Sequence, residues 1–277
     1  MLRDRNPPTC SLSPVRRRLG ALGFVVVCLT LLIGTTTTAQ AKKPNRRASK
    51  IRIAHLALGG DSPAIRRALV TWAQEVRLRT SIEIAQEPAR VGPTSPQLFH
   101  HPLLYLAGAS TFPRQTDAAV ARLRQHIATG GTLIIDNTGR SGPSEAFDRA
   151  VRRLLTRIVG RPLVRLPATH VLFRSFYRLS SAVGRRADVR HVQGVRIGKR
   201  FAVIYLRNDL HGAFARSPTG GPALRAVPGG EAQRERAYRL GINLLMYALC
   251  LDYKDDHTHV MTLLKRRRGV RAPRKGR

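Results

Sequence analysis

The sequence predicts an α/β fold in which a mostly parallel sheet carries helices on both faces. Short apolar segments alternate with amphipathic helical segments from residue 51 to about residue 160. Strands that alternate with helices in this way form parallel sheets. Each helical segment also follows a Ser or Thr that suits an N-cap. At 277 residues, the chain is long enough to bury one sizeable core.

The first half of the domain predicts four strands and three helices. The expected strands are residues 51–58, 82–84, 103–107 and 132–136, and the expected N-caps are Ser62, Thr116 and Ser144. The first helix places Ile65, Leu69, Trp72 and Val76 on one face, as an amphipathic helix does. Prolines between residues 88 and 96 favour a loop there.

The second half predicts a hairpin, a long loop and a last helix. Residues 189–197 and 201–206 flank a Gly198 turn and predict the hairpin. Residues 207–230 are rich in Gly and Pro, and a loop of this length is expected to be functional or mobile. Residues 234–251 predict a helix in which Cys250 fills the core.

The first 41 residues have the three parts of a secretory signal peptide. Arginines at 16–18 precede an apolar run over 19–33, and Ala39 and Ala41 frame a small-residue cleavage site. The run of about 15 residues is shorter than the roughly 20 needed to span a bilayer. We therefore expect cleavage after Ala41 and a periplasmic protein, with a retained anchor facing the periplasm as the alternative.

Charge and cysteine content restrict the choice of partner. The domain over 51–264 lies between a basic linker, 42–50, and a basic tail, 265–277, and the net charge is +33. The 42 Arg against 7 Lys favour an Arg-rich codon usage over selection for phosphate contacts, and aromatic residues are only 5%. We therefore do not expect nucleic acid as a partner, but weak association of the tails with an anionic membrane surface. Cys250 alone follows the leader, so no internal disulfide can form.

Candidate ligand-binding residues follow the predicted strands. They are Gly108, Asp136, Asn137, Arg140 and Asn208. Ligands of doubly wound sheets bind beyond the carboxyl ends of the strands, so these residues could form the rim of a pocket. The alternative is that Gly, Asp and Asn only form turns at these positions.

Catalytic and metal-binding candidates are few. Asp136, His170 and Asp209 could act in acid–base roles, although His170 could equally be a packed loop histidine. His257 and His259 lie beside two aspartates at a spacing that could bind a metal. A nucleophile elbow, a phosphate-binding loop and a zinc ribbon are all missing from the sequence, and we expect no cofactor.

Four sequence blocks resemble the bacterial domain-of-unknown-function 4159 family. They are PLLYLAG at 102–108, GGTLIIDN at 130–137, LPATHVLFRSFYRL at 166–179, and PGGEAQRE at 228–235 with RLGINLLMYAL at 239–249. The resemblance covers nearly all of residues 51–264. One departure is Thr169, which stands where the family pattern has Asp before the histidine.

The resemblance implies a flavodoxin-like fold similar to class I glutamine amidotransferases, but not their reaction. Those enzymes need a cysteine nucleophile at a strand-to-helix elbow, which this chain lacks. We therefore expect an exported, non-catalytic domain that binds a small polar ligand or an envelope protein. The alternative is a hydrolase or transferase that uses Asp136, His170 and Asp209 on a small polar substrate.

Overall fold

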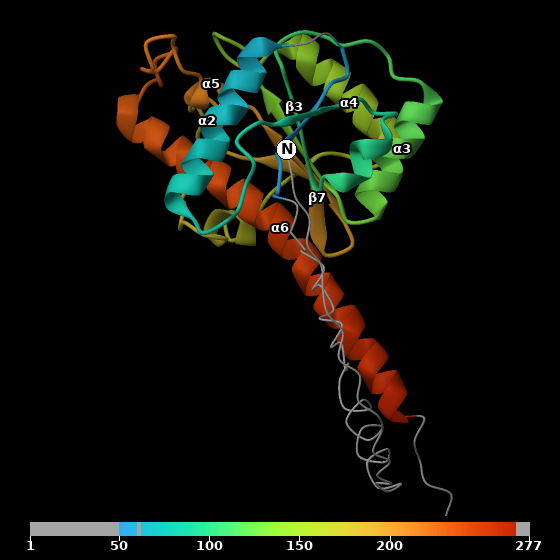
Figure 1. The fold of residues 1–277 in the computed structure, drawn as a ribbon. Coiled ribbons are helices and arrows are strands. Elements are labelled where there is room, and N and C mark those ends of the chain that lie inside the picture. The colour runs from blue at the N-terminus through green and yellow to red at the C-terminus, as the bar shows by residue number, and fades with distance from the viewer. Residues whose placement is uncertain (1–49, 60–61, 270–277) are drawn as a thin grey trace, which may run out of the picture. The chain divides into compact units, whose positions relative to one another are not determined.

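Seven strands form a single mixed sheet in the computed structural model, which describes residues 50–59 and 62–269, with side chains up to residue 250. The strands run in the order β2-β1-β3-β4-β7-β6-β5 (Figure 1). Their bounds are β1 Ala54–Leu56, β2 Ala89–Val91, β3 Leu103–Gly108, β4 Thr132–Asn137, β5 Val164–Arg165, β6 Gln193–Ile197 and β7 Arg200–Leu206. The five strands from β2 to β7 in this order are parallel, and β6 and β5 continue the sheet antiparallel.

Side-chain caps start the helices where the sequence predicts them. The helices are α2 Pro63–Arg79, α3 Asp117–Ala128, α4 Glu145–Val159, α5 Leu210–Phe214 and α6 Gly230–Gly269, with 3₁₀ turns η1 Pro96–His100 and η2 Val171–Arg174. The hydroxyls of Ser62, Thr116 and Ser144 each accept a hydrogen bond from an amide in the first turn of α2, α3 and α4. At the other end of α4, Gly160 adopts a φ of 60°, which glycine reaches without strain.

The helices cover both faces of the sheet (Figure 1). On one face, α2, α5 and α6 bury a core that includes Trp72, Phe214 and Leu244. On the other face, α3 and α4 bury a second core that includes Leu123, Phe147 and Leu154. Trp72 is 1% exposed, so the prediction that its helix packs on the sheet is confirmed.

Four local expectations were wrong. The second strand is β2, within the expected proline loop, and Ile84 forms only an isolated bridge to Ile51. The 207–230 segment contains α5, and the sheet has an additional edge strand, β5. Cys250 is exposed on α6, because it follows the last turn that packs on the sheet.

Several sequence predictions lie outside the described residues. They are the signal peptide over 1–41, all but the last residue of the 42–50 linker, and the end of the basic tail over 270–277. Among the described residues, no helix combines the length and apolar character that crossing a bilayer requires.

Candidate functional site

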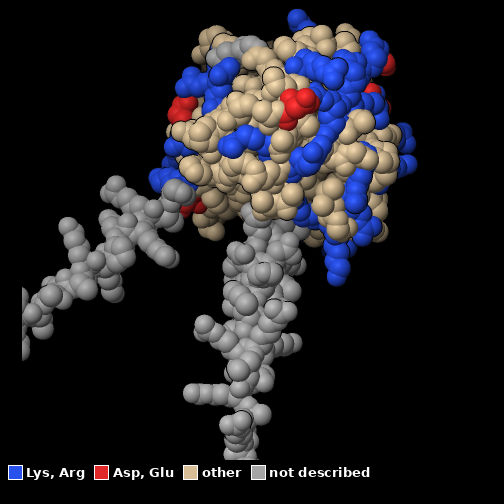
Figure 2. All heavy atoms as spheres, turned by 90° about the vertical axis from the view of Figure 1, so that its right-hand side faces the viewer, with Lys and Arg blue, Asp and Glu red and all other residues tan. Residues whose placement is uncertain are grey.

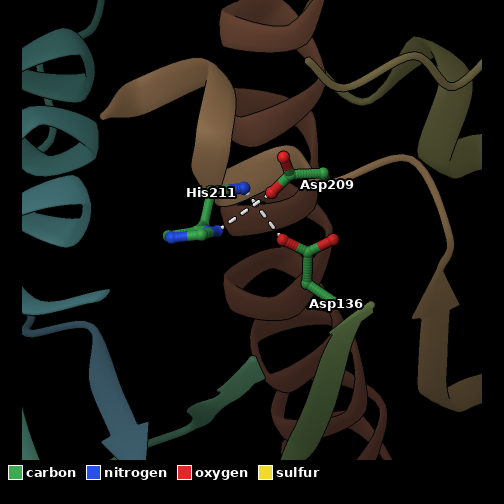
Figure 3. Close-up of side chains that lie close together, drawn as sticks. All are labelled: Asp136, Asp209 and His211. Atoms are coloured by element: carbon green, nitrogen blue, oxygen red, sulfur yellow. Dashed lines mark hydrogen bonds and ion pairs between the residues drawn. The ribbon is translucent and has the colours of Figure 1, made fainter. Parts of the chain in front are cut away.

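Two aspartates and a histidine meet at the carboxyl edge of the sheet (Figure 3). Asp136 lies near the end of β4, where it pairs with Leu206 at the end of β7. Asp209 and His211 follow β7 directly, at the start of α5. Ligand-capable atoms of the three side chains all lie within 4.8 Å of one another. The parallel pairing of β4 and β7 therefore brings together residues more than 70 positions apart in the sequence.

The carboxylate of Asp136 is fully buried and holds the start of α5 against the sheet. It accepts hydrogen bonds from the backbone amides of Leu210, at 3.0 Å, and His211, at 2.8 Å. It also accepts one from the hydroxyl of Tyr105 at 2.7 Å. Burial, and then the neighbouring charge of Asp209, raise the pKa of Asp136 above its ordinary value.

Asp209 is a second buried carboxylate, and it caps α5. Its φ of 53° lies in the left-handed region, which is uncommon for a residue other than glycine. Its side chain accepts a hydrogen bond from the amide of Gly212 at 3.1 Å and forms an ion pair with buried Arg185. Burial alone would raise the pKa of Asp209, but His211 and Arg185 lower it below its ordinary value.

Arg185 is itself held in place by a buried glutamine from α6. The side-chain amide of Gln233 donates to the carbonyls of Gly184 at 3.0 Å, Arg185 at 2.8 Å and Val227 at 2.8 Å. The Arg185 guanidinium also donates to the carbonyl of Arg140 at 2.8 Å. Because Gln233 lies in the 228–235 sequence block, that block positions the arginine that neutralises Asp209.

His211 is the part of this network that reaches a cleft. Its Nδ1 lies 3.0 Å from a carboxylate oxygen of Asp209, and its side chain is 14% exposed. Figure 3 shows the other ring nitrogen on the side away from both carboxylates. Burial opposes the charged form, but the hydrogen bond to Asp209 and the charges of Asp209 and Asp136 raise the pKa of His211 above 6.5. Asp209 therefore fixes Nδ1 as a donor and leaves Nε2 for a ligand.

The cleft beside His211 has a volume of about 420 Å³. Its walls are the carboxyl ends of β1 and β3, the first turn of α2, the loop after β3, and Thr138. Its lining includes the polar side chains of Ser62 and His211 and the apolar rings of Phe112 and Phe147. This size and this mixture of linings suit a small organic ligand with one polar group.

The three side chains have the composition of a metal site but not its free ligand atoms. In the part of the chain that the structure describes, they are the one such cluster of three His, Cys, Asp or Glu residues. Each carboxylate oxygen of Asp136 and Asp209 already accepts at least one hydrogen bond or ion pair from the protein. A cation would have to displace these donors and would face Arg185. The arrangement instead positions the imidazole of His211.

The structure brings Asp136 and Asp209 together, as expected, but places His170 elsewhere. The ring of His170 packs edge-on against Phe201, with ring centres 5.0 Å apart, and against Tyr247 at 5.3 Å. Phe201 is the second residue of β7, whereas Asp136 lies near the end of the parallel neighbour β4. His170 therefore lies at the amino edge of the sheet and does not join the two aspartates.

Gly108 and Asn137 have different roles at the ends of β3 and β4. Gly108 lines the cleft, and a side chain there would collide with the ring of Phe147. The amide of Asn137 exchanges hydrogen bonds with the backbone of Ser144, at 2.9 Å and 2.7 Å. Asn137 therefore closes the loop before α4, which is the turn-forming alternative that the sequence left open.

Arg140 and Asn208 also lack contact with the cleft. The side chain of Arg140 is exposed, and its carbonyl accepts the bond from Arg185. The side-chain amide of Asn208 donates to the carbonyls of Ala182 at 3.0 Å and Val189 at 2.7 Å. Both residues support the loops around Arg185.

His211 was not among the candidate residues predicted from the sequence. The signal for His211 was its place in the long 207–230 segment, two residues after Asp209 and beyond a strand end. His257 and His259 belong to α6, but their side chains lie outside the described ones.

Comparison with known families supports the sequence resemblance. The family model described as "Domain of unknown function (DUF4159)" matches residues 52–249, which include the whole sheet and the three residues of the site. No curated protein matches the chain. Because the match covers most of the chain, this protein belongs to the DUF4159 family.

Proposed function

We propose that this domain binds a small ligand with an anionic, hydrogen-bond-accepting group in the cleft beside His211. The observation that carries the proposal is the orientation of the imidazole. Asp209 holds Nδ1 at 3.0 Å, and His211 contributes to the cleft wall. Because its pKa is raised, the imidazole donates from Nε2 over a wider pH range than an ordinary histidine.

The start of α2 offers a second donor to the same ligand. Pro63 has no amide hydrogen, and the amide of Ile65 donates to the hydroxyl of Ser62 at 3.4 Å. Ala64 lies between them on the cleft wall, and its amide has no partner among the described residues. A free amide at a helix N-terminus favours an anionic group, such as a carboxylate or phosphate.

The strand order supports this location for a ligand. The parallel strands run β2-β1-β3-β4-β7, which is the order of a flavodoxin-like, doubly wound sheet, and we propose that fold for the domain. In such sheets ligands bind at the carboxyl edge, where neighbouring strands connect in opposite directions. The cleft lies at the ends of β1 and β3, which is that point in this order. As part of the same proposal, the fold is similar to that of class I glutamine amidotransferases.

We also propose that the domain is exported and binds its ligand or a protein partner in the cell envelope. The support is the order of basic, apolar and small residues in the first 41 positions. Mass spectrometry of protein from its native host tests this point. We expect an N-terminus at Lys42, and an intact Met1 would contradict cleavage.

A second candidate is acid–base catalysis on the bound molecule. The observation that favours it is the pairing of an imidazole with a buried carboxylate, the arrangement by which enzymes orient a histidine base. In this version His211 takes the role that the sequence suggested for His170. A ligand consumed by wild type but not by His211→Gln would favour catalysis over binding.

A thermal-shift screen of small carboxylates and phosphate monoesters tests the binding proposal. A ligand at a hundredfold excess over its Kd stabilises the folded state by about 2.7 kcal/mol. We expect such a shift in wild type and in the exposed control His100→Gln, but a much smaller one in His211→Gln. A ligand that stabilises all three proteins equally does not use the imidazole and would contradict the proposal.

A further inference from the structure

A second hollow lies on the α4 side of the sheet, between α4 and the segment over 112–115. It has a volume of about 390 Å³. Its apolar lining comes from Phe112, Ala150 and Leu154, and its polar lining includes Arg114, Arg153 and Arg157. We call this hollow the arginine groove. Figure 2 shows that the face of α3 and α4 carries many Lys and Arg side chains and few acidic ones.

One of the three arginines builds the groove. Arg157 donates to the carbonyl of Gln115 at 2.5 Å and forms an ion pair with Asp117 at 2.6 Å. These two bonds fix the 112–115 segment against α4. Arg157 therefore shapes the wall, and its charge is already matched by a carboxylate of this chain.

The other two arginines, Arg114 and Arg153, have no acidic partner among the described residues. Arg114 and Arg153 are exposed and form no ion pair within the described part of the chain. Two other arginines of α4 differ, because Arg149 lies 3.9 Å from Glu145 and Arg152 lies 2.7 Å from Asp148. Of the four arginines of α4, Arg153 is thus the one without an ion pair within the described residues, and it flanks the apolar hollow.

We propose that the arginine groove binds an acidic peptide segment of a partner protein. An apolar side chain of the partner enters between Phe112 and Leu154, and carboxylates on either side of it meet Arg114 and Arg153. Charge complementarity carries the choice of partner, because guanidinium groups pair well with carboxylates. The proposal does not rest on the ligand proposed for the cleft, although Phe112 and Pro113 line both hollows.

Other occupants fit the groove less well. Residues 1–49 contain one acidic residue and residues 270–277 contain none, so these segments of the chain offer little to pair with the arginines. A second copy carries the same net charge of +33, which opposes association. A membrane surface presents its anionic groups in a plane, whereas the apolar lining here lies inside a hollow.

Fluorescence anisotropy with a labelled peptide of sequence Asp-Glu-Leu-Asp-Glu tests the proposal on the purified full chain. The groove variant is Arg114→Glu with Arg153→Glu. Its control is Arg67→Glu with Arg77→Glu, which changes the net charge equally on exposed positions of α2. Because both variants lose the same charge, any difference between them reports the location of binding.

We expect the groove variant to weaken peptide binding at least about tenfold more than the control, a difference of about 1.4 kcal/mol. A charge-neutral block, Thr156→Trp, should also weaken binding, and a peptide with Gly in place of Leu should bind wild type less tightly. Equal losses in the two charge variants would overturn the proposal in favour of nonspecific attraction. It would also be overturned if wild type bound anionic phosphatidylglycerol vesicles through these arginines while the peptide failed to compete, or if the groove variant abolished a wild-type dimer.

Discussion

Histidines at the two edges of the sheet have pKa values that are shifted in opposite directions. At the carboxyl edge, His211 contacts Asp209, lies near Asp136, and has a pKa raised above 6.5. At the amino edge, His126 and His170 lie among apolar side chains and cationic neighbours, and both have lowered pKa values. Burial penalises the imidazolium at all three positions, so the neighbouring carboxylates cause the difference.

This comparison shows why a histidine cannot be assigned a role from its sequence neighbours alone. His170 lies in a block that resembles its family pattern, yet its ring packs against two aromatic rings. His211 lies in a segment expected to be a loop, yet it joins the one buried carboxylate network at the cleft among the described residues. The histidine with the raised pKa is therefore the one that lies near two carboxylates, which the ends of two different strands bring together.

Replacing Asp136, which anchors α5 at the carboxyl edge of the sheet, should have the largest effect on stability. Asp136→Ala leaves the amides of Leu210 and His211 and the hydroxyl of Tyr105 without their acceptor. We expect the free energy of unfolding to fall by about 3–5 kcal/mol, as when one partner of a buried charged network is lost. Chemical denaturation measures this loss. The control Glu83→Ala, at an exposed position with no ion pair within the described residues, should change stability by about 0.5 kcal/mol or less. A similarly small change for Asp136→Ala would show that α5 does not depend on this carboxylate.

Low pH should lower the stability of the folded chain through His126, at the amino edge of the sheet. His126 is 3% exposed, its Nε2 has no partner, and burial, with the charge of Arg200 next, lowers its pKa to about 4. The unfolded chain therefore binds this proton more tightly than the folded one does, and stability falls as pH drops from 6.5 to about 4. A shift of this size corresponds to a loss of about 3 kcal/mol over that window.

The variant His126→Phe isolates that contribution. Phenylalanine keeps an aromatic ring against Phe99 but binds no proton. The stability difference between wild type and variant should therefore change by about 3 kcal/mol between pH 6.5 and pH 4. Parallel pH profiles for the two proteins would mean that His126 does not titrate abnormally.

A smaller effect is expected at His170. Its ring packs edge-on with Phe201 and Tyr247, and its Nδ1 accepts a 3.3 Å hydrogen bond from the amide of Leu172. His170→Phe keeps the ring contacts and loses one partly exposed hydrogen bond, so we expect a cost of about 1 kcal/mol. Ligand binding in the cleft should be unchanged in the same variant. If His170→Phe lost ligand binding but kept normal stability, His170 would have to be part of the ligand site.

Much of the fold was predictable because its signals are local. Ser62, Thr116 and Ser144 each cap the helix expected after them, and the apolar runs of β3 and β4 are continuous. By contrast, β2 has only three residues, and its pairing with β1 is what makes it a strand. The composition of β2 itself gives no strand signal that outweighs the loop signal of the prolines around it.

The site was only half predictable for a related reason. Asp136 and Asp209 could be placed at one edge because strand ends in a parallel sheet meet there. The role of His211 depends on α5, a helix of five residues that is too short to form alone. It forms because Asp209 caps it locally and Asp136, from β4, accepts its first amides, and the contacts to Asp136 are tertiary.

The pKa of His211, measured by NMR titration of its ring protons, tests the central claim most directly. The spectrum of His211→Gln assigns the signal, and His170 provides an internal comparison in the same sample. Because Asp209 and Asp136 favour the imidazolium, we expect His211 to titrate above 6.5 and His170 below it. The protein would then gain stability from His211 below pH 6.5 and lose it as pH rises through the raised pKa. A pKa for His211 at or below that of His170 would contradict the account, because the carboxylates would then not be controlling the imidazole that faces the cleft.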